Sequence, residues 1–352
     1  MGHAVRKNGN TPMAQLELVS LEFCDTVRAR SSKRLKVERA TPKYLWMDGE
    51  MGPASLGSVA TRVLACRPRE VTWQLPARRL NHGVDVFATV EGFSFGDLSI
   101  DKVDHVVWTR GLKRFFLGKR FNCSVDAVPF PASLQELHFG PYFNQPIRRT
   151  NWPRSLQKLT FPTCSRPHGN YPHGFNQPVT EVVWPSSIEM ISLGMNFNQP
   201  IAAVLWPPSL QTIFFGGCFN QPIIGVEWPP SLRNLSFGWH FNQPIIGVAW
   251  PASLRQLSFG EKFDQPVSGV AWPDSLTQLS FGQCFNQPMT GVVWSSSLRQ
   301  LEFGADFWQV VVGIAWPASL KSLTVVRAGK KTACQPNATL PARVSLNNLR
   351  SY

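Results

Sequence analysis

The sequence is poor in cysteine and has no long apolar run. Its seven cysteines among 352 residues are an odd number at scattered spacing, without a C-x-x-C motif. This distribution argues against a disulfide framework and a zinc ribbon, and it fits a reducing compartment, so we expect a cytoplasmic protein, with the nucleus as the alternative. The most apolar stretch of the central region, Val310–Trp316, is too short to span a membrane, and the first residues lack the apolar core of a secretory signal. We therefore expect no membrane association.

The central part of the chain lacks the positive charge that the whole chain carries. The net charge is +13, but residues 81–326 carry 16 Lys/Arg against 15 Asp/Glu. The excess lies in residues 1–80, with 14 against 7, and in residues 327–352, with 5 against none. A solenoid that binds nucleic acid is expected to carry basic residues along its body, where they can follow the phosphates. We therefore expect no nucleic-acid binding through the centre, and only the basic ends are candidates for it.

Catalytic motifs are also missing. No glycine-rich phosphate loop follows a strand pattern, and neither H-E-x-x-H nor a nucleophile elbow occurs. Cys164, His168, Tyr171 and His173 lie close together, but their spacing matches no strong metal-binding template and no fourth ligand is evident. We expect no enzyme, no cofactor and no bound metal.

What the chain has in abundance is one repeated unit. The word F-N-Q-P recurs every 22 residues, apart from one step of 32, with its phenylalanines at Phe143, Phe175, Phe197, Phe219, Phe241, Phe263 (as F-D-Q-P) and Phe285. A tryptophan follows each of them nine residues later, at Trp152, Trp184, Trp206, Trp228, Trp250, Trp272 and Trp294. A strict period of this length is the signature of a solenoid, in which each unit buries its apolar side chains against its neighbours.

Each unit also contains the pattern L-x-x-L-x-F-G, as at Leu254, Leu257 and Phe259. The alternation of the last two positions predicts a short strand, Gly260 is expected to let the chain turn off it, and the proline after most of the tryptophans excludes a helix. We therefore predict a mainly-β repeat solenoid with one parallel sheet. Its core is expected to include Phe197, Trp206, Phe219, Trp228, Phe241, Trp250, Leu254, Leu257 and Phe259. The Asn and Gln of F-N-Q-P are expected to hydrogen-bond the backbone of adjacent coils.

The two words F-N-Q-P-I and W-P-x-S-L-x-x-L resemble the FNIP repeat, within the leucine-rich-repeat-like superfamily. The resemblance covers residues 99–326. It implies a curved, right-handed coil of 22-residue repeats whose usual work is protein binding, and it carries over no catalytic residue. Tryptophan before the proline departs from the commoner form, in which a smaller residue stands, and this is expected to affect packing more than fold.

The ends of the chain are less regular than its centre. We predict a basic, poorly defined segment over 1–57, an N-terminal cap or degenerate coils over 58–98, the repeat solenoid over 99–326 and a C-terminal cap or tail over 327–352. The solenoid contains a ten-residue insertion near 164–174. Some FNIP-repeat proteins carry an F-box before the repeats, but the apolar pattern near the N-terminus lacks a convincing F-box-like opening.

Binding residues are sought where the monotonous repeat varies. Strand residues that point away from the core face the concave side, and aromatic and arginine side chains are common interface anchors. The hypothetical binding residues are Met190, Phe214, Trp239, His240, Tyr142, Arg233 and Arg255. Isolated exposed apolar residues are also normal on protein surfaces, which is the plain alternative.

The expected function is that of a non-catalytic protein–protein interaction scaffold that uses its concave or rim face. Two alternatives stay open. One is a substrate-recruiting adaptor with an F-box-type N-terminus, and the other is a nucleic-acid-associated protein that acts through its basic ends. The sequence does not identify the protein partner.

Overall fold

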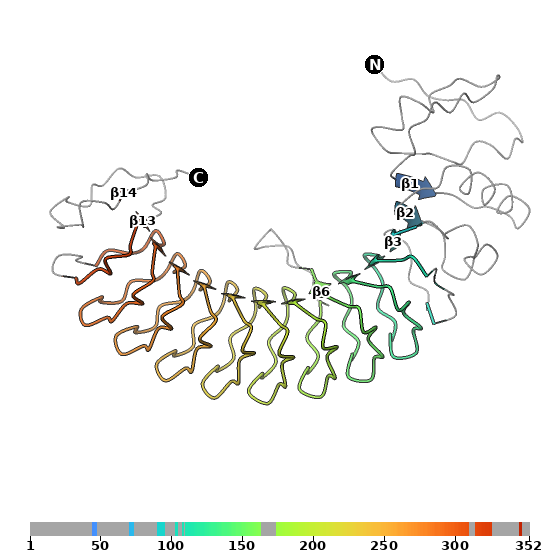
Figure 1. Cartoon of the computed structure of the whole chain (residues 1–352), viewed down its shortest axis with the longest axis horizontal. Helices are drawn as coiled ribbons and strands as arrows, with labels where there is room; N and C mark the ends of the chain where they lie inside the picture. Colours follow the sequence, from blue (N-terminus) through green and yellow to red (C-terminus); the bar gives the residue numbers. More distant parts are fainter. Residues whose placement is uncertain are drawn as a thin grey trace, which may run out of the picture.

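A computed structural model of the chain describes residues 90–95, 103–104, 108, 110–162, 174–309 and 314–325, together with three short outer strands. All strands belong to one parallel sheet, in which they follow one another in sequence order (Figure 1). The strands are β1 (Tyr44–Met47), β2 (Glu70–Trp73), β3 (Gly92–Phe95), β4 (Arg114–Leu117), β5 (Glu136–Phe139), β6 (Lys158–Phe161), β7 (Met190–Leu193), β8 (Thr212–Phe214), β9 (Asn234–Ser236), β10 (Gln256–Ser258), β11 (Gln278–Ser280), β12 (Gln300–Phe303), β13 (Ser322–Val325) and β14 (Ser345–Leu346). The described part of the chain contains no helix, and hence none that could cross a membrane.

The register of the sheet repeats the period of the sequence. Leu257 of β10 lies beside Leu235 of β9 and Leu279 of β11, each 22 residues away. Because side chains alternate between the two faces of a strand, this in-phase pairing places every leucine of the row on the same face. The predicted repeat solenoid with one parallel sheet and 22-residue repeats is confirmed.

The sheet also extends beyond the repeats that the sequence pattern delimits. β1 lies within residues 1–57, β2 lies within 58–98, and both pair in parallel with the next strand along the chain. Parallel pairing uses backbone groups, so a strand can join the sheet without the repeat's phenylalanine and tryptophan. The insertion over 163–173 lies outside the described residues, as does most of the chain on either side of the solenoid.

The core lies between the sheet and the returning loops of each coil. Phe241 is fully buried and stacks on Phe219 and Phe263 of the neighbouring coils, with ring centroids 6.0 and 6.1 Å apart and planes within 8° of parallel. The tryptophans form a second row at the margin of the core, where Trp228 is buried and Trp250 is partly buried. Each coil therefore completes its core only against its two neighbours, as in other solenoids.

Polar side chains connect successive coils on either side of this core. Asn242 Oδ1 accepts hydrogen bonds from the backbone N–H of Asp264 (2.9 Å) and from the side-chain amide of Gln265 (3.0 Å). Ser253 Oγ donates to the carbonyl oxygen of Leu232, one coil earlier, at 2.6 Å. Corresponding bonds recur along the solenoid, so backbone groups that the turns would leave unpaired are satisfied and the strands are held at a constant spacing.

Candidate functional site

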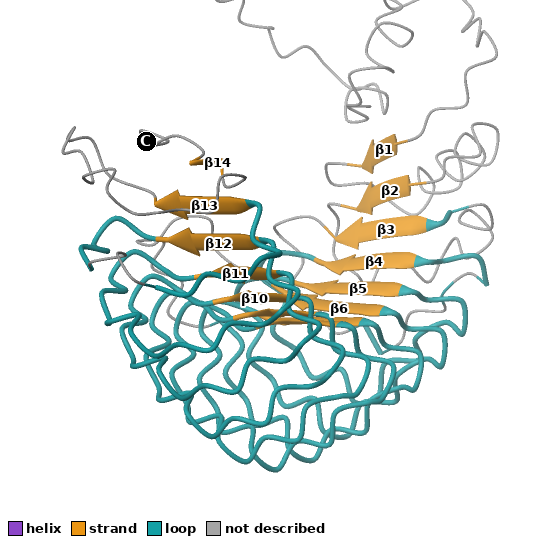
Figure 2. Ribbon diagram, turned by 60° about the vertical axis from the view of Figure 1, so that its left-hand side comes forward, coloured by secondary structure: helices purple, strands orange, loops and turns teal. Residues whose placement is uncertain are grey.

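The sheet lines the inner, concave side of an arc, and the returning loops lie on its outer side (Figures 1 and 2). In β10, Leu257 points into the core, whereas Gln256 is exposed and Ser258 is half-buried on the other face. Every repeat thus presents two side chains on the concave face. The varied residues among them form the candidate site.

A hollow of about 680 Å³ crosses the concave face over β5–β9. We call it the apolar hollow. Its wall includes the half-buried side chains of Met190, Phe214 and Trp239, from three successive coils. The remaining lining residues are His138, Lys158, Thr160, Phe161, Pro162, Ser192, Met195, Phe215, Gly216, Gly217, Ser236, Phe237 and Gly238. Thioether and aromatic groups in a concavity can receive an apolar side chain.

Met195 is a part of this hollow that the sequence did not identify. It follows Gly194, as Trp239 follows Gly238, so the two residues hold equivalent positions in their repeats. Gly217 holds the position between them, and a Cβ atom there would lie 2.3 Å from Met195 Sδ. The missing side chain leaves space for the thioether. Met195 could have been identified from the sequence, because its repeat position is equivalent to that of Trp239.

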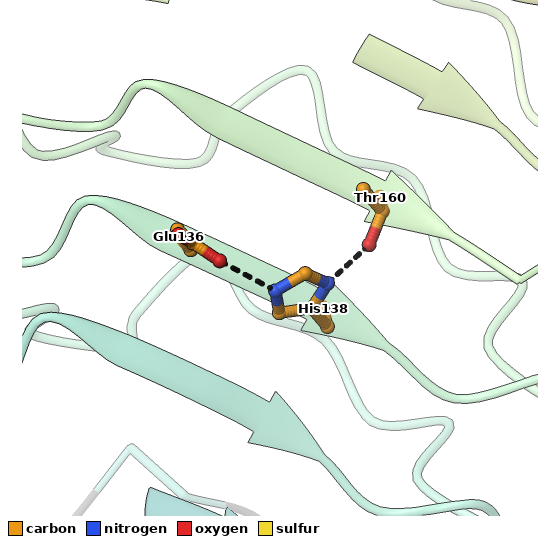
Figure 3. A network of polar contacts seen from close by, with 3 residues as sticks. All are labelled: Glu136, His138 and Thr160. Carbon is orange, nitrogen blue, oxygen red and sulfur yellow. Dashed lines mark hydrogen bonds and ion pairs between the residues drawn. The ribbon is translucent and has the colours of Figure 1, made fainter. Parts of the chain in front are cut away.

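A polar cluster lies at the other end of the apolar hollow, on β5 and β6 (Figure 3). His138 Nε2 lies 3.3 Å from Glu136 Oε2, and His138 Nδ1 is hydrogen-bonded to Thr160 Oγ1. Phe116 of β4 stacks on the imidazole, with ring centroids 4.2 Å apart. Burial lowers the pKa of His138, although the hydrogen bond and the charge of Glu136 act in the opposite direction. The neutral ring that this favours can donate through Nε2 and accept from the Thr160 hydroxyl.

The order carboxylate, imidazole and hydroxyl resembles that of a catalytic triad, but the surroundings differ. Thr160 lies inside β6, which pairs with β5 on one side and with β7 on the other. Backbone N–H groups of such a strand are used in the sheet, so they are not available as the paired donors that an oxyanion needs. The cluster therefore has the parts of a polar binding surface rather than those of an acyl-transfer site.

A second, polar hollow of about 610 Å³ runs over the later strands, β7–β13. Its floor is a row of amide side chains, with Asn234, Gln256, Gln278 and Gln300 at corresponding positions. Beside it lies a notch of about 410 Å³ that is lined by Arg255, Thr277, Gln278, Arg299 and Gln300. We call it the arginine notch.

The structure brings together only some of the hypothetical binding residues. Met190, Phe214 and Trp239 share the apolar hollow, and Arg255 lines the arginine notch two coils from Phe214. The exposed Arg233 and His240 and the half-buried Tyr142 line none of these three concavities.

His240 does not line the apolar hollow, although its neighbour Trp239 does. Its backbone N–H donates to the carbonyl oxygen of Gly217 at 2.8 Å, but its side chain is exposed outside the apolar hollow that Trp239 lines. The three candidate metal ligands in the insertion, Cys164, His168 and His173, lie outside the described residues. Among the residues that are described, no three His, Cys, Asp or Glu side chains gather where they could hold a metal ion.

A stacked parallel sheet on the concave side and loops on the convex side define a leucine-rich-repeat-like solenoid. The family "FNIP Repeat" matches residues 121–164, 175–218 and 219–254. The chain thus contains FNIP repeats within residues 121–254.

Solved structures agree with this class. CroV588, described as a novel circular LRR protein structure, is 27% identical in sequence and superposes with a TM-score of 0.62. The match covers 81% of this chain and 47% of CroV588, so the chain spans about half the length of that protein. A leucine-rich repeat protein from Bacteroides ovatus is 11% identical over 74% of this chain and 80% of its own, with a TM-score of 0.16, which is too low to compare folds. A comparison with curated proteins gives no match.

Proposed function

We propose that this protein is a non-catalytic scaffold that binds a partner protein through its concave face. The apolar hollow carries the proposal, because it gathers Met190, Phe214 and Trp239 from three coils into one concavity of about 680 Å³. Elsewhere on the concave face, the later strands repeat the same Gln and Ser side chains. Aromatic side chains in partly desolvated hollows are frequent sources of binding energy at protein interfaces.

The surroundings of the hollow fit a protein partner better than a nucleic acid. Residues 81–326 are almost neutral, whereas a solenoid that binds nucleic acid is expected to carry a net positive charge along its body. The two other candidate functions rest on the F-box-type N-terminus and on the basic ends, and apart from the strands β1, β2 and β14 these segments lie outside the described residues. A reducing, intracellular compartment fits the free thiols of Cys218 and Cys284.

The proposal is tested by photo-crosslinking in cells. Phe214 is replaced by p-benzoylphenylalanine, and crosslinked partners are isolated after nuclease treatment and identified by mass spectrometry. Leu205 is the matched control position, because it is apolar and 78% exposed but lies outside the concave hollows. We expect a partner that crosslinks from position 214 and not from position 205.

Binding of the partner is then measured for two purified variants of the whole chain. The double variant Phe214→Ala/Trp239→Ala is expected not to bind the partner, whereas Leu205→Ala/Val293→Ala is expected to bind it as the wild type does. Equal capture by both variants would show that the apolar hollow is not the binding site. Partners that disappear with nuclease would instead favour nucleic-acid association.

A further inference from the structure

The arginine notch lies close to the apolar hollow and differs from it in chemistry. Arg255 and Arg299 precede β10 and β12, and Thr277 holds the equivalent position between them. Adjacent strands are about 4.8 Å apart, so the two arginine Cα atoms are separated by roughly 10 Å. The shorter threonine side chain leaves the space of about 410 Å³ between the two longer ones.

Both guanidinium groups are exposed and lack an acidic partner. Within the described residues, neither Arg255 nor Arg299 forms an ion pair, and the same is true of Arg233 in the preceding coil. Arg233 and Arg255 belong to adjacent coils, and Arg299 lies two coils beyond Arg255, so the three like charges repel one another weakly. An anionic group between Arg255 and Arg299 would reduce this repulsion.

The other groups of the notch can also donate hydrogen bonds. The side-chain amides of Gln278 and Gln300 border the same space. The Thr277 hydroxyl donates to the carbonyl oxygen of Arg255 at 3.0 Å. The hydroxyl oxygen can still accept a hydrogen bond, whereas the carbonyl oxygen of Arg255 already has a donor. Two guanidinium forks and two amides are a donor set suited to a carboxylate.

Charge nearby disfavours a long polyanion as the occupant. Glu302 is exposed on the concave face and lines the polar hollow next to the notch. Beyond the carboxyl ends of the same strands lie Glu261 and the exposed Asp306. A nucleic-acid strand that crossed the sheet would meet these carboxylates, whereas one acidic side chain would meet the arginines alone.

We propose that the arginine notch binds an Asp or Glu side chain of the same protein segment whose apolar side chain enters the apolar hollow. This inference rests on the proposed function. Phe214 on β8 is in register with Ser280 on β11, three strands or about 14 Å away, and Gln278 lies two residues from Ser280, about 7 Å along the strand. The separation of Phe214 and Gln278 is therefore about 16 Å. An extended segment advances roughly 3.3 Å per residue, so the acidic and apolar residues of the partner should be separated by about five positions.

The test uses a library of random 16-residue peptides displayed on phage and selected against the whole chain. We expect enrichment of peptides with an aromatic or aliphatic residue about five positions from Asp or Glu. A synthetic peptide of the enriched sequence is then titrated by fluorescence anisotropy against the wild type and variants. Arg255→Gln/Arg299→Gln should weaken binding about ten- to a hundredfold, because charge-assisted hydrogen bonds are lost.

Three controls separate the two proposals. Arg148→Gln removes an arginine that pairs with Glu181 away from the notch and should leave affinity unchanged. A peptide in which the Asp or Glu is replaced by Asn or Gln should bind the wild type and the double arginine variant with equal affinity. Circular dichroism of Arg255→Gln/Arg299→Gln should match the wild type, since both side chains are exposed.

The possible failures differ in what they overturn. Peptides whose binding requires Phe214 but is unaffected by loss of both arginines would contradict the proposed role of the arginine notch. They would leave the proposed function unchanged. Enriched peptides that are insensitive to Phe214→Ala would overturn the proposed function as well. Arginine-dependent binding of a 20-nucleotide single strand that displaces the peptide would overturn the acidic-peptide assignment in favour of nucleic acid.

Discussion

Asp264 stands where the other F-N-Q-P words have asparagine, yet its Oδ1 atom accepts the backbone N–H of Asn286 at 2.9 Å, as an asparagine would. Gln287 of the next coil also donates its side-chain amide to Asp264, at 2.9 Å. The bonds that Asp264 makes to the following coil use only acceptor oxygens. A carboxylate can therefore replace the amide at this position.

We expect Asp264→Asn to change the free energy of unfolding by less than about 0.5 kcal/mol, because the acceptor is kept. Asp264→Ala should lower it by about 1–3 kcal/mol, because the half-buried donors of Asn286 and Gln287 lose their partner. Urea unfolding followed by circular dichroism measures both values. Equal effects of the two substitutions would show that the ladder contributes no specific hydrogen-bond energy.

The regular part of the fold could be predicted from the sequence because one pattern is repeated in phase. The leucine row through Leu235, Leu257 and Leu279 determines which face of every strand is buried, and the in-register sheet follows from the 22-residue period. The same contacts between neighbouring coils, repeated along the chain, thus specify both the architecture and the core. The backbone bonds of the asparagine row follow from the same regularity.

The candidate site was less predictable, because it depends on residues that differ between coils. Met190, Phe214 and Trp239 could be noticed as departures from the repeat, but the period does not say which of them share a concavity. That depends on side-chain size at intermediate positions, such as the absence of a side chain at Gly217 beneath Met195. The sequence also contained no clear sign that Ser253 bonds the carbonyl of the preceding coil.

The second prediction compares two kinds of glycine, one packed closely against the preceding coil and one with a left-handed backbone conformation. Gly260 was expected to let the chain turn, but it has no positive φ, and a Cβ atom there would lie 1.8 Å from the carbonyl oxygen of Gly238 in the preceding coil. Gly247 has a φ of 84° and nothing within 4 Å of its Cβ position. Close packing of coils requires the first glycine, and backbone conformation favours the second.

Gly247→Ala should therefore cost about 1–2 kcal/mol, the strain of a left-handed conformation. Gly260→Ala should cost at least ~3 kcal/mol, because the coils must separate and their hydrogen bonds weaken. Thermal and urea unfolding of the two variants provide the comparison. A smaller loss for Gly260→Ala than for Gly247→Ala would contradict this account.

The tryptophan row leads to a third prediction. The indole N–H of Trp228 is buried and has no hydrogen-bond partner among the described residues, although its ring stacks on Trp250 at 6.4 Å. Phe130 occupies the equivalent slot of an earlier coil and stacks on Trp152. A phenylalanine ring is thus compatible with the row.

Trp228→Phe should alter the free energy of unfolding by no more than about 1 kcal/mol, because loss of apolar area is offset by removal of the unpaired donor. Trp228→Leu should cost about 2–4 kcal/mol, since the aromatic stack is lost together with more of the ring volume. Urea midpoints and m-values for both variants test this. A large destabilisation by Trp228→Phe would mean that the indole N–H has a stabilising interaction in solution.

The fourth prediction concerns pH and His138. Burial is the largest cause that lowers its pKa, and the charge of Lys158 on β6 adds to the effect, while Glu136 on its own strand opposes both. Arg114 on β4 lies beside Glu136 in the sheet register, and the Phe116 ring that covers the imidazole carries no charge. The folded protein therefore binds a proton at His138 less readily than the unfolded chain does.

The sign of the stability change follows from this difference. Above the ordinary histidine pKa of about 6.5, the ring is neutral in both states and the full stability is present. As the pH falls below 6.5 toward the lowered pKa of the folded state, the unfolded chain takes up the proton first, so stability is lost. Once the ring is protonated, Nδ1 becomes a donor, so its hydrogen bond with Thr160 Oγ1 reverses direction.

His138→Gln removes this titration and keeps a polar side chain. Urea unfolding is measured for the wild type and the variant between pH 8 and pH 5, and the difference between the two proteins cancels the contribution of other titrating groups. We expect the wild type to lose stability relative to His138→Gln as the pH is lowered through this range. A difference that is independent of pH would show that His138 is as readily protonated in the folded protein as in the unfolded chain, and one that changes in the opposite direction would show that it is protonated more readily.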